Sequence, residues 1–176
     1  NGCIYRRRRK VGGKSVAMGP WRARIRHGDG RTEDISLRLK DKQAAQSELR
    51  KLIAEREKEQ AGLLPARAVR EAAGRELAGV VAEFQASRRA VSRAPRYVED
   101  MGQCLARLFR ECGWQRLRDV NAADFEKWRA GQLGMAAKTR KEYGNHLRNF
   151  CNWLCATGRL AANPVQHLAS VDVRGQ

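Results

Sequence analysis

The hydrophobic pattern of this chain changes its period part-way along, and that change constrains the fold most strongly. Residues 21–26, Trp-Arg-Ala-Arg-Ile-Arg, alternate strictly between apolar and cationic side chains, which is typical of a strand with one buried face. From residue 77 onward, apolar residues recur instead at helical spacing. Gly62-Leu63-Leu64-Pro65 interrupts both patterns. The sequence therefore predicts two domains of different class.

Residues 1–62 are predicted to form an α+β domain, with a three-stranded antiparallel sheet and one helix. Residues 35–40 repeat the alternation of residues 21–26, and His27-Gly28-Asp29-Gly30 between them is a hairpin signal. Only an odd-numbered loop sets apolar residues opposite one another, so we expect Ile35 opposite Trp21 and a bulged turn with Gly30 in the left-handed region. Residues 2–5 are expected to supply the third strand, before a basic loop over residues 6–14.

A helix should cover the apolar face of this sheet. Asp41 can cap it and Gly62 ends it. Its apolar stripe is expected to consist of Ala44, Ala45, Leu49, Leu52 and Ile53. The opposite face would stay open, and its predicted DNA-binding residues are Arg22, Arg24, Arg26 and Arg38. A β-ribbon fits a major groove, where arginine reaches phosphates and guanine edges; the alternative is a solvated basic face.

Residues 63–75 are predicted to be a partly helical linker, and residues 76–170 a bundle of four to five helices. Pro95 opens the second of these helices and Asn121 caps the third. On the fourth, near residues 136–157, one sector is apolar, with Tyr143, Leu147, Phe150 and Leu154. Another sector lacks acids and carries Lys138, Lys141, Asn145, Arg148 and Asn152. Such a stripe suits contacts with phosphates and base edges, unless it is a plain solvated face.

The charge of the chain favours a nucleic-acid partner. There are 36 Lys and Arg residues against 19 acids, a net charge of +17, and nine of the cations precede the first acid. No apolar run resembles a membrane span or a signal peptide, so a membrane surface is the weaker alternative. The five cysteines form no C-x-x-C pair, which predicts buried free thiols in a reducing cytoplasm and no metal site.

Three runs in the second domain resemble the end of the core-binding domain, a SAM-like bundle, of phage-integrase-type tyrosine recombinases. They are Lys138-Thr139-Arg140-Lys141-Glu142-Tyr143, Phe150-Cys151-Asn152-Trp153-Leu154, and the closing run from Gly158 to Asn163-Pro164. Pro95-Arg96-Tyr97-Val98 resembles an earlier DNA-facing helix start, and residues 1–62 resemble the arm-type DNA-binding domain. The resemblance implies that these residues face DNA at the crossover site: Arg93, Arg96, Lys138, Thr139, Lys141, Asn145 and Arg148.

Enzymes of this family break and rejoin DNA with a tyrosine nucleophile, beside a His-x-x-Arg motif in a C-terminal catalytic domain. None of the three histidines, His27, His146 and His167, begins such a motif. The tyrosines, Tyr5, Tyr97 and Tyr143, all lie in the presumed binding modules. We therefore expect no catalytic residue, cofactor or metal in this chain. Residues 171–176 are expected to begin a tether to an absent catalytic domain, with which the full protein would be a recombinase.

The predicted function is sequence-specific binding of double-stranded DNA, at arm-type and core-type sites, by the N-terminal half of the integrase of a mobile genetic element. Such a protein would act in the bacterial or phage-infected cytoplasm, without a membrane or a small-molecule substrate, and whether it forms a homo-oligomer on DNA stays open. One alternative is a free-standing DNA-binding regulator of the excisionase or AP2 type. Another is a basic RNA-binding protein, which is disfavoured because aromatics make up 6% of the chain and mostly lie at core spacing.

Overall fold

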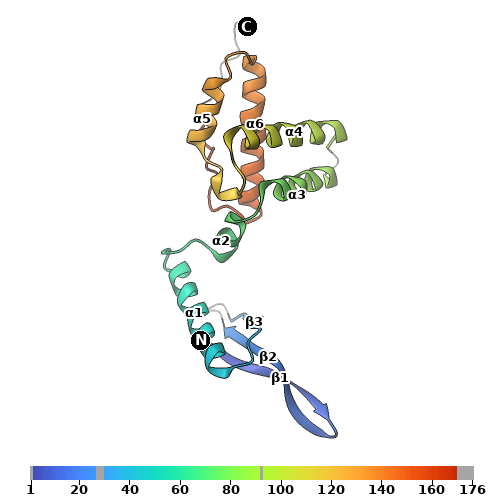
Figure 1. Cartoon of the computed structure of the whole chain (residues 1–176), viewed down its shortest axis with the longest axis vertical. Helices are drawn as coiled ribbons and strands as arrows, with labels where there is room; N and C mark the ends of the chain where they lie inside the picture. The colour runs from blue at the N-terminus through green and yellow to red at the C-terminus, as the bar shows by residue number, and fades with distance from the viewer. Residues whose placement is uncertain (1, 27–29, 92, 170–176) are drawn as a thin grey trace. The chain divides into compact units, whose positions relative to one another are not determined.

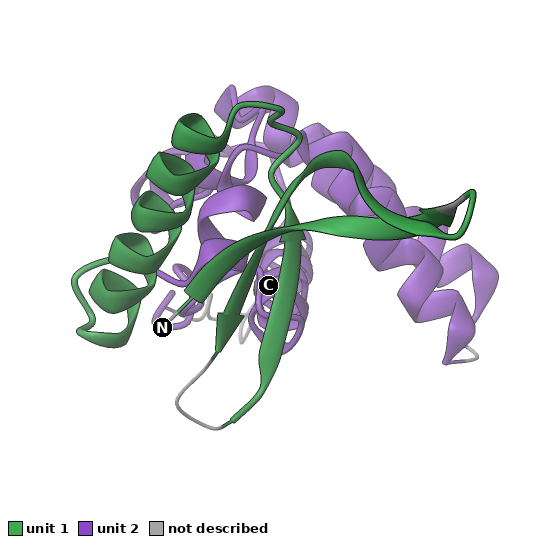
Figure 2. Ribbon diagram, turned by 90° about the horizontal axis from the view of Figure 1, so that it is seen from below, with its two compact units in different colours: residues 1–64 green, residues 65–176 purple. Residues whose placement is uncertain are grey.

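The chain divides into two compact units, residues 1–64 and residues 65–176 (Figure 2). The computed structural model describes residues 2–26, 30–91 and 93–169. A mixed unit with one sheet and one helix comes first, and an all-helical unit follows (Figure 1). This architecture confirms the predicted fold class. The expected hairpin turn at residues 27–29 and the expected tether at residues 171–176 lie outside the described residues.

The sheet of the first unit has three antiparallel strands in the order β1 (Gly2–Val11), β2 (Lys14–Arg26) and β3 (Thr32–Ser36). The predicted parity is confirmed, because Ala23 pairs with Ile35 and apolar residues share one face. The predicted pairing of Ile35 with Trp21 is wrong by two residues. Trp21 instead accepts a hydrogen bond from the Leu37 backbone N–H and donates its own N–H to the Leu39 carbonyl. Gly30 has the predicted left-handed conformation, with φ +84°.

The expected basic loop at residues 6–14 is also wrong, because these residues continue the hairpin. β1 runs on to Val11, which pairs with Lys14 across a two-residue turn. Both turn residues, Gly12 and Gly13, have positive φ, +57° and +81°. A type I′ turn needs positive φ at both central positions, and glycine adopts it without strain. The Gly-Gly pair was therefore a hairpin signal rather than a loop signal.

Helix α1 (Lys42–Gln60) covers the apolar face of the sheet. The Asp41 carboxylate caps it by accepting a hydrogen bond from the Ala44 N–H, with 2.7 Å between the atoms. Ala44 itself is exposed, which corrects the predicted stripe. The small core consists of three buried side chains, Ala23, Ile25 and Leu49, and five partly buried ones, Ile4, Ile35, Leu37, Leu52 and Ile53.

The second unit is a helical bundle. Its elements are α2 (Arg67–Ala73), α3 (Leu77–Ala90), α4 (Pro95–Cys112), the short 3-10 helix η1 (Leu117–Asp119), α5 (Ala122–Gly131) and α6 (Ala137–Ala156). Asn121 caps α5 as predicted. The predicted apolar sector of α6 is buried in one core with residues of the other helices, where Phe84 and Phe150 meet edge to face at 5.4 Å. Within the described part of the chain, no helix is both long and apolar enough to span a membrane.

Residues 65–75 pack with the second unit, although the sequence indicates a linker there. Helix α2 fills most of this segment, and Ala72 is buried in the core of the bundle. The Arg75 carbonyl accepts a hydrogen bond from the Leu117 N–H, and its guanidinium pairs with Glu83. The boundary between the two units therefore lies after Leu64, rather than being spread over the whole segment.

Candidate nucleic-acid interface

The first basic surface is the sheet face that α1 leaves uncovered, and we call it the sheet face. Alternation along β2 puts Ala23 and Ile25 into the core, with 0% and 3% of their surface exposed. Arg22, Arg24 and Arg26 therefore point to the other side. Their cross-strand neighbours share this face, so Tyr5 and Ser36 lie beside Arg22, and Thr32 lies beside Arg26. Three of the four predicted arginines thus lie together.

Arg24 is held in place on the sheet face by an acid that the sequence analysis did not consider. Its guanidinium donates two hydrogen bonds to the Asp34 carboxylate, at 2.8 and 3.0 Å, and lies 4.8 Å from the centre of the Tyr5 ring. The hydrogen bonds from Arg24 lower the pKa of the Asp34 carboxyl to about 2. Asp34 stays ionised at neutral pH and offsets the charge of Arg24. The net positive charge of the sheet face therefore comes from Arg22 and Arg26.

Arg22 and Arg26 differ from Arg24 in their contacts. Arg22 donates a hydrogen bond to the Asp34 backbone carbonyl at 3.4 Å, and its Nε is buried without a partner among the described residues. Arg26 ends β2 and is exposed. Arg38 lies beyond the end of β3, is exposed and has an unusual positive φ of +57°. Because Arg38 does not belong to a strand, alternation does not fix the side of the sheet on which it lies.

The second basic surface is the polar stripe of α6, consisting of Lys138, Lys141, Asn145 and Arg148, and we call it the α6 stripe. Thr139, which the resemblance also implies, is one position on from Lys138, and helical periodicity places it on another side of α6. The opposite side of α6 is anchored by Leu147, Phe150 and Leu154, none of which has any exposed surface. Lys138 and Asn145 are exposed, whereas Arg148 is half-buried. Arg148 donates to the Asn145 side-chain oxygen at 3.4 Å and to the Leu168 carbonyl at 3.2 Å. A hydrogen bond to a neutral carbonyl orients the guanidinium and leaves its charge uncompensated.

The start of α4 lies beside the middle of α6. The ring of Tyr97 meets the ring of His146 edge to face, with 5.9 Å between their centres. Arg96 is in the first turn of α4, and Arg93 precedes that helix; both are exposed. The contact between Tyr97 and His146 shows that the start of α4 packs beside α6, so the two groups of predicted residues come from neighbouring helices.

Two further arginines join the α6 stripe, and the sequence analysis missed both. Arg129 of α5 and Arg140 of α6 line a small concavity with Lys141, Arg148 and the carboxyl-terminal residues Leu168 and Ala169. Arg129 donates to the Ala169 carbonyl at 2.7 Å and also pairs with Glu126. The Nε of Arg140 is buried without a hydrogen-bond partner in the described structure. No sequence signal distinguishes Arg129 from the other arginines of the bundle, because only the packing of α5 brings it here.

The Asn163-Pro164 turn fastens the carboxyl-terminal segment to α6. The Asn163 side-chain amide donates to the Asn152 side-chain oxygen at 2.6 Å, and its oxygen accepts a hydrogen bond from the Val165 N–H at 2.8 Å. The side-chain oxygen of Asn152 is thus engaged in the fold. Val165 is fully buried and completes the anchor.

Acidic residues mark one limit of the α6 stripe. A second hollow of ≈ 530 Å³ lies between α4 and α6, lined by Asp100 and Glu142 together with His146 and Arg148. Burial lowers the pKa of His146, so this imidazole is neutral at pH 7. The acids make this hollow a poor surface for phosphate, and it borders the α6 stripe directly, because Asn145 also lines it.

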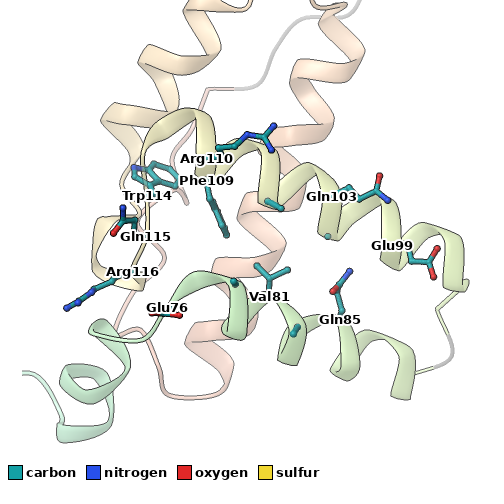
Figure 3. Close-up of a pocket in the computed structure, with 14 residues that line it drawn as sticks. Glu76, Val81, Gln85, Glu99, Gln103, Phe109, Arg110, Trp114, Gln115 and Arg116 are labelled. Carbon is teal, nitrogen blue, oxygen red and sulfur yellow. The ribbon is translucent and has the colours of Figure 1, made fainter.

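A cavity of ≈ 730 Å³ forms a groove between α3 and α4, and it does not coincide with either basic surface (Figure 3). Its floor is apolar, with Val81 and Phe109, and its rim carries acids as well as arginines: Glu76, Glu99, Arg110 and Arg116. Mixed charge of this kind does not favour a polyanion.

The most buried tyrosine serves the core. Tyr143 packs against Trp128 with 4.9 Å between ring centres, and burial raises its pKa. Its hydroxyl is therefore a poor nucleophile. The five cysteines are free, but only Cys151 is fully buried, and Cys3 is exposed, which corrects the expectation of buried thiols. Among the described residues no group of acids, histidines and cysteines could hold a metal ion.

Comparison with known proteins gives two structural matches. No protein-family model matches the sequence, and no curated protein is significantly similar to it. A lambda integrase dimer bound to a COC′ core site matches 86% of this chain and 43% of its own, with a TM-score of 0.52 and 11% identity. The chain shares the fold of part of an integrase. The integrase from mycobacterium phage Brujita matches 53% of this chain and 32% of its own, with a TM-score of 0.49 and 22% identity. The chain thus spans less than half of either integrase.

Proposed function

We propose that this chain is the DNA-binding, N-terminal half of an integrase-type tyrosine recombinase, and that it binds double-stranded DNA sequence-specifically through two separate surfaces. The fold carries the proposal, because 86% of the chain matches an integrase whose structure was determined on core-site DNA. Strand breaking and rejoining would belong to a catalytic domain of the full protein, and we assign no catalytic residue here.

The sheet face would bind the arm-type site. Arg22 and Arg26 supply the charge for phosphate contacts. Arg24, which Asp34 and Tyr5 hold in one orientation, is suited to a guanine edge. Holding the guanidinium beforehand reduces the entropy lost on binding. Arg38 would contribute from the end of the sheet.

The α6 stripe would bind the core-type site, together with Arg93 and Arg96. Lys138 and Lys141 are suited to phosphates, and Asn145 to a base edge, since asparagine matches the major-groove edge of adenine. Arg129 and Arg140 add cations to the same side of α6. Joining two such surfaces in one chain raises the affinity for DNA that carries both sites.

The test uses the full chain and duplexes selected from a random pool. Two unrelated sequence classes should emerge, one for each surface. Arg22→Gln with Arg26→Gln should weaken binding to one class about tenfold or more and spare the other. Lys138→Gln with Lys141→Gln, which removes the same charge, should do the reverse. Fluorescence anisotropy over a salt series measures both affinities.

Equal losses for both classes would show a single unspecific basic surface and contradict the proposal. Preferential binding of single-stranded or structured RNA would favour an RNA-binding protein instead. Salt dependence provides an internal check, because each lost phosphate contact should reduce the slope of log affinity against log salt by about 0.9.

A further inference from the structure

The outer part of the β1–β2 hairpin stands apart from the rest of the first unit, and we call residues 7–18 the distal hairpin. Its strands pair only with each other, from Arg7 opposite Met18 to Val11 opposite Lys14, whereas β3 pairs with residues 22–26 of β2. Residues 7–10 and 12–18 are all exposed. A two-stranded hairpin without a face to pack on is only marginally stable in water, so a partner is the natural reason to keep one.

The charge of the distal hairpin indicates the chemistry of that partner. Its five cations are Arg7, Arg8, Arg9, Lys10 and Lys14, and residues 2–26 contain no acid. The structure shows no ion pair for these five side chains among the residues that it describes. Like charges at this density repel one another, and a polyanion would relieve the repulsion.

The two faces of the distal hairpin differ. Cross-strand pairing puts Arg7 and Arg9 on one face with Val16 and Met18, whose side chains are 45% and 48% exposed. The other face carries Arg8 and Lys10 with two small residues, Ser15 and Ala17. Guanidinium groups beside apolar groups match the floor of a major groove, where guanine edges and thymine methyl groups lie.

The base of the distal hairpin is built to set its direction. The register shifts between Tyr5 and Arg7, opposite Gly19, whose φ is +80°. Such a bulge bends and twists a ribbon. Arg6 holds the bend by donating its Nε–H to the Gly19 carbonyl at 2.9 Å, and its guanidinium lies 5.8 Å from the centre of a Trp21 ring. At roughly 3.4 Å per residue, the five residues of β1 beyond the bulge extend about 14 Å, comparable with the roughly 12 Å width of a major groove.

We propose that the distal hairpin enters the major groove of duplex DNA with its Arg7 and Arg9 face towards the base edges, as a contact separate from the sheet face. The inference rests on the proposed function and deepens it, because it assigns the first unit a second DNA-contacting element. The opposite face, with Arg8 and Lys10, points away from the bases and contributes charge only.

The test uses the full chain and a duplex that it selects from a random pool. A deletion of residues 7–18 joins Arg6 to Gly19 and leaves the pairing of Tyr5 with Arg22 in place. This deletion should lower affinity about tenfold or more and reduce the salt slope by up to about 4.5, because it removes five cations. Circular dichroism should show an intact first unit, since the distal hairpin contributes nothing to the core.

Two charge-matched variants distinguish the two faces. Arg7→Gln with Arg9→Gln should lose about tenfold more affinity than Arg8→Gln with Lys10→Gln. The first pair should also expose guanine N7 atoms in the major groove to dimethyl sulfate methylation, at positions that the parent chain protects.

An unchanged affinity after the deletion would overturn this inference and leave the proposed function standing. Equal losses from the two faces, with unchanged N7 protection, would also overturn it, because the hairpin would then act only as diffuse charge. Failure of the parent chain to bind any duplex would overturn the proposed function itself.

Discussion

The two basic surfaces hold their arginines in different ways. On the sheet face, the central cation Arg24 is paired with a carboxylate, Asp34, so its charge is locally offset. On the α6 side, Arg148 donates instead to the backbone carbonyl of Leu168. A carbonyl orients a guanidinium without cancelling its charge. Arg129 combines both kinds of contact, because it donates to the Ala169 carbonyl and also pairs with Glu126. The charge of Arg24 is therefore offset by the group that orients it, whereas Arg148 keeps its charge but depends on the position of Leu168.

The two cores behind these surfaces differ as well. Four apolar residues of the first unit are buried among those that the structure describes, and they are Ala23, Ile25, Ala45 and Leu49. The second has an aromatic core in which Phe150 lies against Phe84 and Phe109. A small domain buries a smaller share of its surface and is correspondingly less stable. The sheet face should therefore be the more easily lost of the two.

The largest expected effects come from truncating each core. Phe150→Ala should cost about 3–5 kcal/mol in the free energy of unfolding of the bundle, because a fully buried ring leaves a cavity. Leu49→Ala should cost about 2–3 kcal/mol in the first unit, where the site is at the edge of the core and can partly collapse. Scanning calorimetry of the full chain would measure both losses.

The affinity for each class of duplex DNA should also differ between these two core variants. Although its cost is smaller, Leu49→Ala should abolish binding through the sheet face, because a small domain has little stability to lose. Phe150→Ala should affect only the duplex class bound by the α6 stripe. If each variant weakened both duplex classes, the two units would not be independent.

Much of the bundle could be predicted from the sequence because apolar residues at helical spacing leave little choice of face. The apolar sector of α6, with Tyr143, Leu147 and Phe150, is buried as predicted. The sheet was harder to predict. The parity of the hairpin loop fixes which face of the sheet each residue occupies, but it does not fix the register of the strands. A shift of two residues keeps every apolar side chain inside, so Ile35 could lie opposite Ala23 as readily as opposite Trp21.

Other features needed the tertiary structure. The distal hairpin was missed because residues 6–10 are all cations and show no alternation. Asp34 was overlooked on the sheet face because its pairing with Arg24 depends on the register. Arg129 lies on a different helix from the α6 stripe, and helix packing alone brings the two together. The hydrophobic period of a sequence indicates on which side of a helix or strand a residue lies, but not which other element packs against that side.

The next effect concerns the carbonyl-held arginines of the bundle. Arg148→Gln should lower affinity for the core-type duplex about tenfold and release Leu168, so that backbone amides of residues 165–169 exchange hydrogen faster. Arg96→Gln removes the same charge from the same side of the bundle without touching that segment. It should weaken binding and leave exchange unchanged. Hydrogen exchange measured by mass spectrometry on both variants checks this, and equal exchange in the two would remove the proposed coupling.

The smallest effect is the pH dependence set by Asp34. Its folded pKa, about 2, lies below the unfolded value of roughly 3.9, so the native state favours the ionised carboxylate. The resulting stabilisation is fully present above the unfolded pKa and is lost as the pH falls from about 4 towards 2. Asp34→Asn should flatten the stability profile of the first unit in that window. At neutral pH the same substitution should also strengthen unspecific binding to duplex DNA slightly, because no carboxylate offsets the charge of Arg24 any longer. It should relax the sequence preference, because the guanidinium of Arg24 is no longer held in one orientation. If the stability of the Asp34→Asn variant still falls with pH below pH 4, another carboxylate causes the acid sensitivity. Asp34 would then not be the acid that orients Arg24 on the sheet face.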